Sequence, residues 1–492
     1  MNVTIPSIHY LALLPILIFF GAALVLVVVS AVTSKRLGSA VATATTVLAC
    51  VAVLVVNFLQ WSYVAHHGAT TTMAHALVLD DFAVVATSVI ALGLLLSALV
   101  AHDWAIRERI SGVDYHVLAL AASTGAMVMA QANDLVVIFL GLEMLSIGLY
   151  VLVAFDRHRA ASSEAALKYF LLGGFASAIF IYGAALVYGA TGSTNVSSIG
   201  YFLASNVVLR PGLLYAGGAL LLIGFAFKVA AVPFHLWSPD VYQGAPTPVT
   251  GFMASVVKVG AFAGLVRVLL SGLGTQMDTW RPIIWVLVVL TSLVGASLAI
   301  VQRDVKRLLA YSSINQAGFM LLGVWSANAR GVAGTLFYVT TYVPVVIATF
   351  AIVTLVGGLG DEHHSIEHYR GLARRQPWLG AALAVLLLSQ LGVPLTVGFY
   401  AKYSVLVAAL DAGGGALALI ALLSAAIAAY FYLFFASILY EPSDDDDSNV
   451  RIVVSRASFV VIAFGVAVAL VFGIWPGPIV SWAQHATLLF LP

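Results

Sequence analysis

Long, uninterrupted apolar stretches dominate the pattern of residues along this chain. Leu11 to Val32 and Leu213 to Phe227 contain no charged residue, and many similar runs follow. A helix needs roughly 20 apolar residues to cross the hydrocarbon core of a bilayer. The pattern therefore predicts an all-α, polytopic membrane protein with about fourteen transmembrane helices.

The polar residues between the runs give approximate bounds for these helices. In the first half, the predicted helices span residues 8–33, 39–61, 78–101, 115–131, 134–155, 162–189 and 213–236. In the second half, they span residues 247–270, 282–301, 305–325, 331–358, 378–410, 415–440 and 453–475.

Two of the predicted helices contain residues that interrupt a helix. Pro233 lies in the helix at 213–236, and Gly392, Pro394 and Gly398 lie near the middle of the helix at 378–410. Proline removes a backbone hydrogen bond and kinks or breaks a helix. Irregular backbone at membrane depth is tolerated only where protein or a wet cavity covers it. We therefore expect functional residues near both interruptions.

Composition supports the membrane assignment and excludes several other classes. Of the 492 residues, 62% are hydrophobic and only 9% are charged, whereas a soluble domain is about one quarter charged. The formal net charge of +1, without an arginine-rich patch, argues against nucleic-acid binding. Cys50 is the only cysteine, which excludes an internal disulfide and a cysteine-ligated cluster. The start of the chain lacks the positive stretch of a signal peptide, so the first helix is expected to be retained.

Basic residues predict the orientation in the membrane. They concentrate in alternate loops, such as those containing Arg157, Arg303 and Arg374, whereas the other loops contain few, among them Arg210 and Arg330. Basic loops face the cytoplasm in bacterial inner-membrane proteins. Both termini are therefore expected on the periplasmic side.

The longest acidic run is Asp444 to Asp447. Four consecutive aspartates lack the ligand spacing of a calcium-binding loop. We expect a solvated cytoplasmic loop here rather than a metal site.

A few ionisable residues lie inside the apolar runs. Glu143 is the one acidic residue placed deep in a predicted helix, and Lys228, Lys258 and Lys402 are placed similarly. A charge at the bilayer centre costs on the order of 3 kcal/mol or more, so such residues rarely persist without a role. A lysine amine in a low dielectric loses its proton more easily, and a nearby carboxylate opposes this loss. These residues are therefore candidates for a proton relay.

Structural roles are the alternatives for each candidate. Lys228 and Lys258 could form a structural ion pair with Glu143, and Lys402 could cap the interrupted helix. Lys168, nearer a membrane edge, is a secondary candidate that could instead extend to the interface or pair with Glu164. His235 could transfer protons or cap the broken helix.

A polar group on the tenth predicted helix is a weaker candidate, and its members are Tyr311, Ser312, Ser313 and Gln316. These side chains could hold water, but polar residues also join helices to one another. The second role is favoured.

Two segments resemble the antiporter-like subunits of respiratory complex I (NADH:quinone oxidoreductase) and the related multisubunit cation/proton antiporters. They are Phe227-Lys-Val-Ala-Ala-Val-Pro-Phe-His-Leu-Trp-Ser-Pro-Asp-Val-Tyr-Gln-Gly-Ala-Pro-Thr-Pro-Val-Thr250 and Gln302-Arg-Asp-Val-Lys-Arg-Leu-Leu-Ala-Tyr-Ser-Ser-Ile314. The resemblance covers roughly residues 115–440 and is greatest to subunit N. Subunit L would need a long C-terminal extension, and subunit M would have a glutamate where this chain has Lys402.

The resemblance implies two inverted repeats of five helices, each with a broken helix. The implied organisation is three N-terminal helices (1–114), a first repeat (115–270), a second repeat (282–440), and the acidic loop with the last helix (441–492). The resemblance also implies that Glu143 pairs with Lys228, that Lys258 is the central lysine, and that Lys402 lies near the proton exit.

The resemblance implies a proton-translocating membrane subunit without a redox centre of its own. FMN, iron–sulfur clusters and the quinone site are expected in partner subunits, and the expected membrane partners are subunits M, L, K, J, A and H. No Gly-rich nucleotide loop is present in this chain. The rival hypotheses are a subunit of a sodium/proton antiporter that works without redox chemistry, and a structural spacer that pumps nothing.

Overall fold

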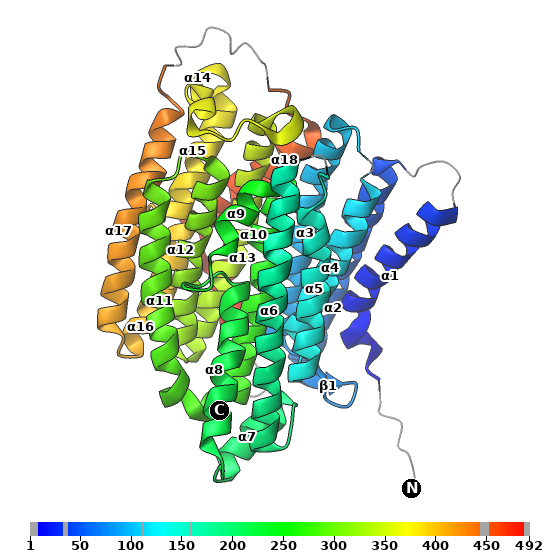
Figure 1. Cartoon of the computed structure of the whole chain (residues 1–492), viewed down its shortest axis with the longest axis vertical. Helices are drawn as coiled ribbons and strands as arrows, with labels where there is room; N and C mark the ends of the chain where they lie inside the picture. The colour runs from blue at the N-terminus through cyan, green and yellow to red at the C-terminus, as the bar shows by residue number, and fades with distance from the viewer. Residues whose placement is uncertain (1–7, 33–37, 111, 158, 443–451, 487–492) are drawn as a thin grey trace.

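The computed structural model describes residues 8–32, 38–110, 112–157, 159–442 and 452–486. Most of these residues form long helices that stand side by side along the longest axis of the molecule (Figure 1). The acidic run at 443–451 and the basic residues Lys35, Arg36 and Arg451 lie outside the described residues, so the predicted solvated loop stays a prediction.

The helices follow the predicted order. Those of the first half are α1 (Tyr10–Val32), α2 (Ser39–His67), α3 (Asp81–Arg107), α4 (Val113–Gln131), α5 (Leu135–Val153), α6 (Ala160–Thr191), α7 (Val196–Ser205), α8 (Pro211–Lys228), α9 (Trp237–Gly244) and α10 (Thr247–Val266). Those of the second half are α11 (Met277–Ile300), α12 (Val305–Ser326), α13 (Ala329–Gly357), α14 (Leu372–Arg375), α15 (Pro377–Leu391), α16 (Val397–Asp411), α17 (Gly415–Ile438), α18 (Arg456–Ile474) and α19 (Gly477–His485).

Shorter elements occupy the connections between these helices. The strands β1 (Thr70–Thr72) and β2 (Leu77–Leu79) form an antiparallel hairpin. A π-helix, η1 (Arg267–Gly272), continues α10, and the 3-10 turns are η2 (Gly274–Gln276), η3 (Leu359–Asp361) and η4 (Ile366–Tyr369).

The prediction of a polytopic all-α membrane protein is confirmed. In the described part of the chain, 12 helices are long and apolar enough to cross a membrane. The more polar α12 and the two shorter helices α15 and α16 account for the remaining predicted spans. The sequence patterns did not predict α7, α9, α14, α19 or the β-hairpin, because these elements are short and lie in connections.

Both predicted interruptions are present in the structure. The helix predicted at 213–236 ends already at Lys228, and α9 begins at Trp237. The helix predicted at 378–410 is divided between α15 and α16. Each gap contains a non-glycine residue with positive φ, Ala230 (φ 58°) and Leu395 (φ 69°). That conformation costs an L-residue about 1–2 kcal/mol, so the surrounding packing must hold both gaps in place.

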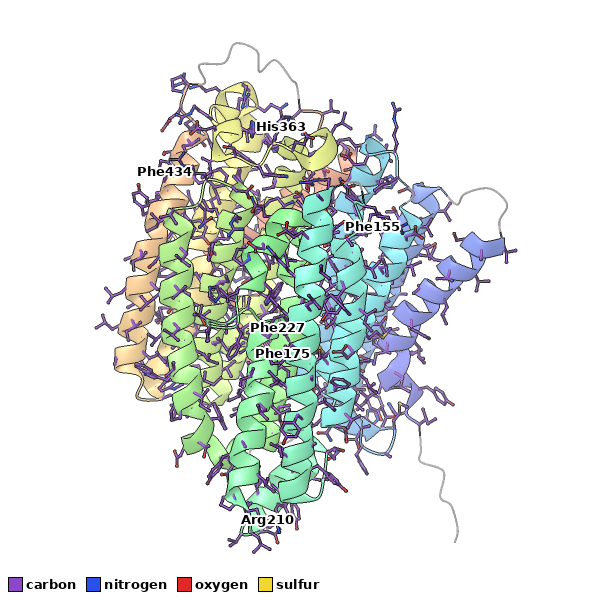
Figure 2. The ribbon with its side chains drawn as sticks, in the orientation of Figure 1. Phe155, Phe175, Arg210, Phe227, His363 and Phe434 are labelled. Carbon is purple, nitrogen blue, oxygen red and sulfur yellow. The ribbon has the colours of Figure 1, made fainter. Side chains whose placement is uncertain are left out.

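Two equivalent backbone bridges mark the starts of α5 and α12. Asp134 caps α5 and pairs with Asn195, and Asp304 caps α12 and pairs with Ser365. In each pair of equivalent residues, the second follows the first by 170 positions (134 to 304, and 195 to 365). Helix α7, which follows the first bridge, lies at the lower end of the molecule, and His363, next to the second, lies at the upper end (Figures 1 and 2).

The same spacing of 170 relates two close helix contacts. A Cβ on Gly125 of α4 would lie 2.5 Å from the backbone nitrogen of Leu145 on α5. A Cβ on Gly295 of α11 would lie 2.6 Å from that of Asn315 on α12. The bridges and these contacts support the inverted repeats, which stay a prediction because the equivalence covers only part of each repeat.

Each residue of α10 is buried, which places this helix at the centre of the molecule. Helices α3, α4, α12 and α13 pack around it. By contrast, α1 and α2 expose much of their surface, as outer helices in contact with lipid would. Lys258, on α10, therefore occupies the interior of the protein.

Candidate functional site

Lys228 is the last residue of α8 and is only 3% exposed. Its neighbour Phe227 lies about midway between the two ends of the molecule (Figure 2). The Lys228 Nζ donates to Ser146 Oγ at 2.8 Å and to Tyr169 Oη at 3.2 Å. The amino group is therefore hydrogen-bonded to two neutral hydroxyl oxygens, deep in the molecule.

Glu143 lies near the middle of α5, as expected, and its side chain is only partly buried. Its Oε1 is buried and has no hydrogen-bond partner among the described residues. The structure shows no ion pair between Glu143 and Lys228, whose ammonium contacts Ser146 on the next turn of α5 instead. The expected pair is therefore not a direct contact.

Lys258 is 3% exposed and lies on the central helix α10. Its Nζ donates to the backbone oxygen of Ser313 on α12, and it also lies 5.5 Å from the ring centre of Tyr342. Because this oxygen belongs to a helix backbone, it accepts a hydrogen bond from either the charged or the neutral amine.

The hydroxyl of Ser313 connects three helices. Tyr342 of α13 donates to Ser313 Oγ at 3.0 Å, and Tyr242 of α9 lies 3.4 Å from the same oxygen. Gln316, one turn along α12, donates to the backbone oxygen of Gln390 at 2.8 Å. Ser313 and Gln316 of α12 therefore join helices, which is the role favoured for this polar group.

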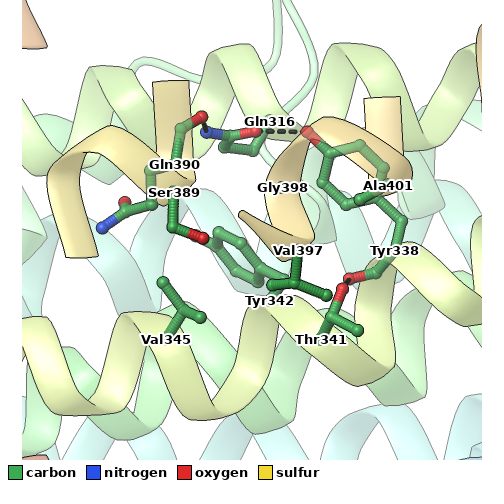
Figure 3. Close-up of a pocket in the computed structure, with 10 residues that line it drawn as sticks. All are labelled: Gln316, Tyr338, Thr341, Tyr342, Val345, Ser389, Gln390, Val397, Gly398 and Ala401. Carbon is green, nitrogen blue, oxygen red and sulfur yellow. Dashed lines mark hydrogen bonds between the residues drawn. The ribbon is translucent and has the colours of Figure 1, made fainter. Parts of the chain in front are cut away.

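A small cavity lies beside these residues (Figure 3). It is about 20 Å³ in volume, which is enough for one water molecule. Gln316 and Tyr338 hydrogen-bond at its edge, and Tyr342, Ser389 and Ala401 also line it. The cavity therefore extends the polar region from Ser313 to the broken helix of the second half.

Lys402 is 6% exposed and lies on α16, just after the second break. Its Nζ donates to the backbone oxygen of Leu391, the last residue of α15, at 2.7 Å. It also lies 4.8 Å from the ring centre of Phe319. The cap that was considered as the alternative role of Lys402 is therefore present in the structure, and its acceptor Leu391 follows the cavity-lining residue Gln390 in the chain.

Aromatic rings separate the first lysine from the second. Tyr169, which accepts from Lys228, stacks on Trp237 with ring centres 4.6 Å apart. Trp237 in turn lies edge-on to Tyr242, at 6.5 Å. Tyr242 approaches Ser313, the partner of Lys258. Hydroxyl and amide side chains therefore lie on the Lys258 side of Tyr242, around the cavity, whereas ring contacts fill the space between Lys228 and Tyr242.

The two secondary candidates differ in their surroundings. Lys168 is 44% exposed and forms ion pairs with Glu164 at 2.7 Å and Asp240 at 3.0 Å, as its local-pair alternative predicts. His235 is buried in the first break, and its Nδ1 has no hydrogen-bond partner among the described residues. No side chain caps the start of α9, but the His235 ring contacts the backbone of Pro233 within the break, so both roles of His235 stay predictions.

Sequence reasoning missed a buried charge cluster at the upper end. Lys306, in the first turn of the helix predicted at 305–325, is completely buried. It donates to Asp361 at 3.0 Å, and Arg159 pairs with the same carboxylate at 3.2 Å. Burial alone would raise the pKa of Asp361, but Lys306, His364 and Thr247 together hold it well below its usual value. The clue in the sequence was the position of Lys306 in the first turn of an apolar helix.

A second buried pair joins Arg267 to Asp80. Arg267, near the end of the predicted helix at 247–270, is only 2% exposed and begins the π-helix η1. Its two terminal nitrogens each donate to Asp80 at 2.8 Å, and its Nε donates to the backbone oxygen of Ala130. This pair fixes the end of α10 to the start of α3.

Comparisons with known proteins agree with this architecture. The family model described as NADH:quinone oxidoreductase/Mrp antiporter, TM, matches residues 132–428. The chain is 38% identical to NADH-quinone oxidoreductase subunit N of Salinispora arenicola, covering 98% of both chains. It is 41% identical to subunit N 3 of Streptomyces griseus, over 78% of this chain and 71% of that protein.

Solved structures agree as well. A chain of respiratory complex I from Thermus thermophilus, with bound aureothin, superposes with a TM-score of 0.82 at 33% identity, over 96% of this chain and all of that one. A chain of the Mrp complex from Dietzia sp. has a TM-score of 0.84 at 20% identity, over 97% of both chains, which shows the shared fold. The chain therefore belongs to the NADH:quinone oxidoreductase/Mrp antiporter family of membrane subunits, and within that family to the subunit N proteins of the NADH-quinone oxidoreductases.

Proposed function

We propose that this chain translocates protons as subunit N of a NADH:quinone oxidoreductase, through a relay of Lys228, Lys258 and Lys402 governed by Glu143. One observation carries the proposal. The three amino groups are at most 6% exposed, and the hydrogen bonds of each go to neutral oxygens rather than to a carboxylate. Neutral acceptors can hold a lysine in both protonation states. A purely structural ion pair would hold the lysine in the charged state only.

Glu143 is in a position to receive a signal from outside the chain. It lies on the same side of α5 as Leu140 and Ile147, which are both 58% exposed and present an apolar surface. A partly exposed carboxylate within such a surface is costly against lipid. A neighbouring subunit that covers this face would remove that cost, and a charge movement within it would be felt by Glu143 and then by Lys228.

The space between Lys228 and Tyr242 is the proposed control point. Because the rings of Tyr169 and Trp237 fill it, a proton needs rearranged side chains or inserted water to pass. A change at Glu143 that displaces the Lys228 ammonium from Tyr169 would disturb this stack. The later route, past Ser313 and the 20 Å³ cavity, already has hydroxyl and amide groups in place.

The energy for this transfer comes from other subunits under the proposal. NADH oxidation, FMN, the iron–sulfur clusters and quinone reduction belong to partner subunits, and the membrane partners are subunits M, L, K, J, A and H. The chain lies in a bacterial inner membrane, with its basic loops in the cytoplasm and both termini in the periplasm. Two antiporter-like repeats, 115–270 and 282–440, follow the three N-terminal helices.

Two measurements test this function against its rivals. NADH dehydrogenase activity should copurify with the chain, whereas a sodium/proton antiporter would purify without it. In the assembled complex, Lys402→Met should lower the number of protons pumped per NADH, while Lys168→Met, at an exposed pair, should leave that number unchanged. An unaltered proton number in Lys402→Met, together with a lower thermal stability, would favour the structural spacer.

A further inference from the structure

A buried histidine lies outside the lysine series, among the N-terminal helices. His116, in the first turns of α4, is 1% exposed. Two threonines of α2 contact its ring, one at each nitrogen. Thr43 Oγ1 lies 2.9 Å from Nε2, and Thr46 Oγ1 lies 3.0 Å from Nδ1. The imidazole is therefore held at both nitrogens by hydroxyl groups.

The positions of the two hydroxyl hydrogens determine which protonation state of the His116 ring the site can hold. Thr43 donates to the backbone oxygen of Ser39 at 2.9 Å, and Thr46 donates to that of Ala42 at 3.0 Å. A hydroxyl has one hydrogen and two lone pairs. If both hydrogens stay on the backbone, both ring nitrogens must donate, and His116 is an imidazolium.

The neutral form needs only a small rearrangement. One hydroxyl turns from its backbone oxygen to the unprotonated ring nitrogen, and the helix carbonyl that it leaves keeps its own helical hydrogen bond. No other side chain has to move. The site can therefore hold His116 in both protonation states. In each state, both ring nitrogens have a hydrogen-bond partner, as buried polar groups generally do.

A second histidine links this site to the surface. His102 of α3 is half-buried, and its Nδ1 lies 3.1 Å from Thr43 Oγ1 and 3.5 Å from Ser39 Oγ. The contacts thus run from the partly exposed His102 through the Thr43 hydroxyl to the buried His116. They lie at the end of the molecule where α3 ends in Arg107, among the basic loops.

Asp103 and Arg107, the charged groups that flank this site on α3, contact other partners. On α3, Asp103 accepts from Ser455 and Ser458, and Arg107 contacts Glu108. The other charged groups on the helices packed against α4 are Asp114 of α4 itself, Asp81 at the far end of α3, Glu143 of α5 and Lys258 of α10, and α1 has none. None of these described groups shares the contacts of His116, whereas His102 does so through Thr43.

We propose that His116 is a proton-binding site, loaded from the basic end of the molecule through His102 and Thr43. The proton comes from water, binds the bare ring nitrogen of His116, and returns the rotated threonine hydroxyl to its backbone oxygen. This site is separate from the lysine relay, and the proposal does not rest on the function of that relay.

Histidine C2 deuterium exchange tests this proposal, because the exchange rate follows the protonation state of each imidazole. The rate is read by peptide mass spectrometry on the full chain, in its assembled complex, over a series of pH values. His116 should show a sigmoidal profile within the series, which runs from about pH 3 to 8. A flat profile across that range would overturn the proposal, because the ring would then keep one protonation state.

Three variants separate the effect of the Thr46 hydroxyl on His116 from general effects on α2. Thr46→Val removes the acceptor for Nδ1–H and should move the His116 midpoint by about one pH unit to lower pH. Thr45→Val alters a half-buried neighbour that makes the same type of backbone bond, to Val41 at 3.0 Å, and should leave the midpoint in place. Thr46→Ser keeps the hydroxyl and should restore the original midpoint. Equal midpoints in Thr46→Val and Thr45→Val would contradict the proposed role of the Thr46 hydroxyl at His116.

Discussion

Lys228 donates its buried ammonium to Ser146, one turn of α5 beyond Glu143, and not to Glu143 itself. Glu143 and Ser146, the partner of Lys228, therefore lie one turn apart on α5, and the carboxylate and the ammonium make no direct contact. A direct ion pair in a low dielectric would hold the proton on the lysine, whereas a hydroxyl acceptor does not require the charged form. This relationship underlies the relay proposed for the chain.

Removing the hydroxyl partners of Lys228 should destabilise the protein without unfolding it. We expect Ser146→Ala and Tyr169→Phe each to lower the free energy of unfolding by about 1.5–3 kcal/mol, the usual loss for a hydrogen bond to a charged group. Thermal unfolding in detergent measures the change. Ser163→Ala, at an exposed position on α6, is the control. Midpoints equal to the control in both variants would mean that the ammonium does not depend on these two oxygens.

Two adjacent glycines of α6 provide a test of packing next to Lys228. A Cβ on Gly173 would collide with the Tyr150 hydroxyl beside the cavity that Lys228 lines, whereas a Cβ on Gly174 would meet nothing within 4 Å. Overpacking of this kind typically costs about 1–3 kcal/mol. Gly173→Ala should therefore lower the thermal midpoint and Gly174→Ala should not. Equal effects of the two substitutions would contradict the described packing of α5 against α6.

The buried pair between Arg267 and Asp80 should be important for stability. Removal of one partner leaves an unpaired buried charge, which costs about 3–5 kcal/mol. We expect this loss in Arg267→Met, read from thermal unfolding of the purified chain. Arg330→Met breaks an exposed pair with Asp411 and should cost less than about 1 kcal/mol. Comparable losses in the two variants would show that the Arg267 pair is not buried.

Because of Asp361, the stability of the protein should depend on pH in the acid range. Burial opposes the low pKa of this carboxyl, but Lys306, His364 and Thr247 place it well below the usual value. A lowered pKa contributes stability above the unfolded-state value near 3.9 and loses it as the pH falls through the folded-state value. Between about pH 5 and pH 2, the thermal midpoint of the original protein should fall more steeply than that of Asp361→Asn. Parallel curves would contradict this role of Asp361.

Long apolar runs were enough to predict the helical fold, because hydrocarbon requires every backbone group to be bonded within its own helix. Proline and glycine marked both broken helices for the same reason, since they disrupt those bonds. Buried lysines could likewise be identified, because Lys228, Lys258 and Lys402 lie in runs with hardly any other charge.

Partners across the fold could not be predicted in this way. Ser146, Tyr169 and Ser313 are ordinary polar residues along their helices, and only packing brings them to the lysines. Lys306 and Arg267 lie near helix ends, where an exposed position is the usual expectation. His116 and Thr46 are 70 residues apart, and nothing in either segment alone indicates their contact.

The ratio of protons pumped to NADH oxidised, measured in proteoliposomes with the assembled complex, tests the central claim most directly. Lys228→Met removes the first amino group of the relay and should lower this ratio while NADH oxidation continues. Lys168→Met should leave the ratio unchanged, because its exposed amine lies outside the relay. An undiminished ratio in a fully assembled Lys228→Met complex would contradict the account.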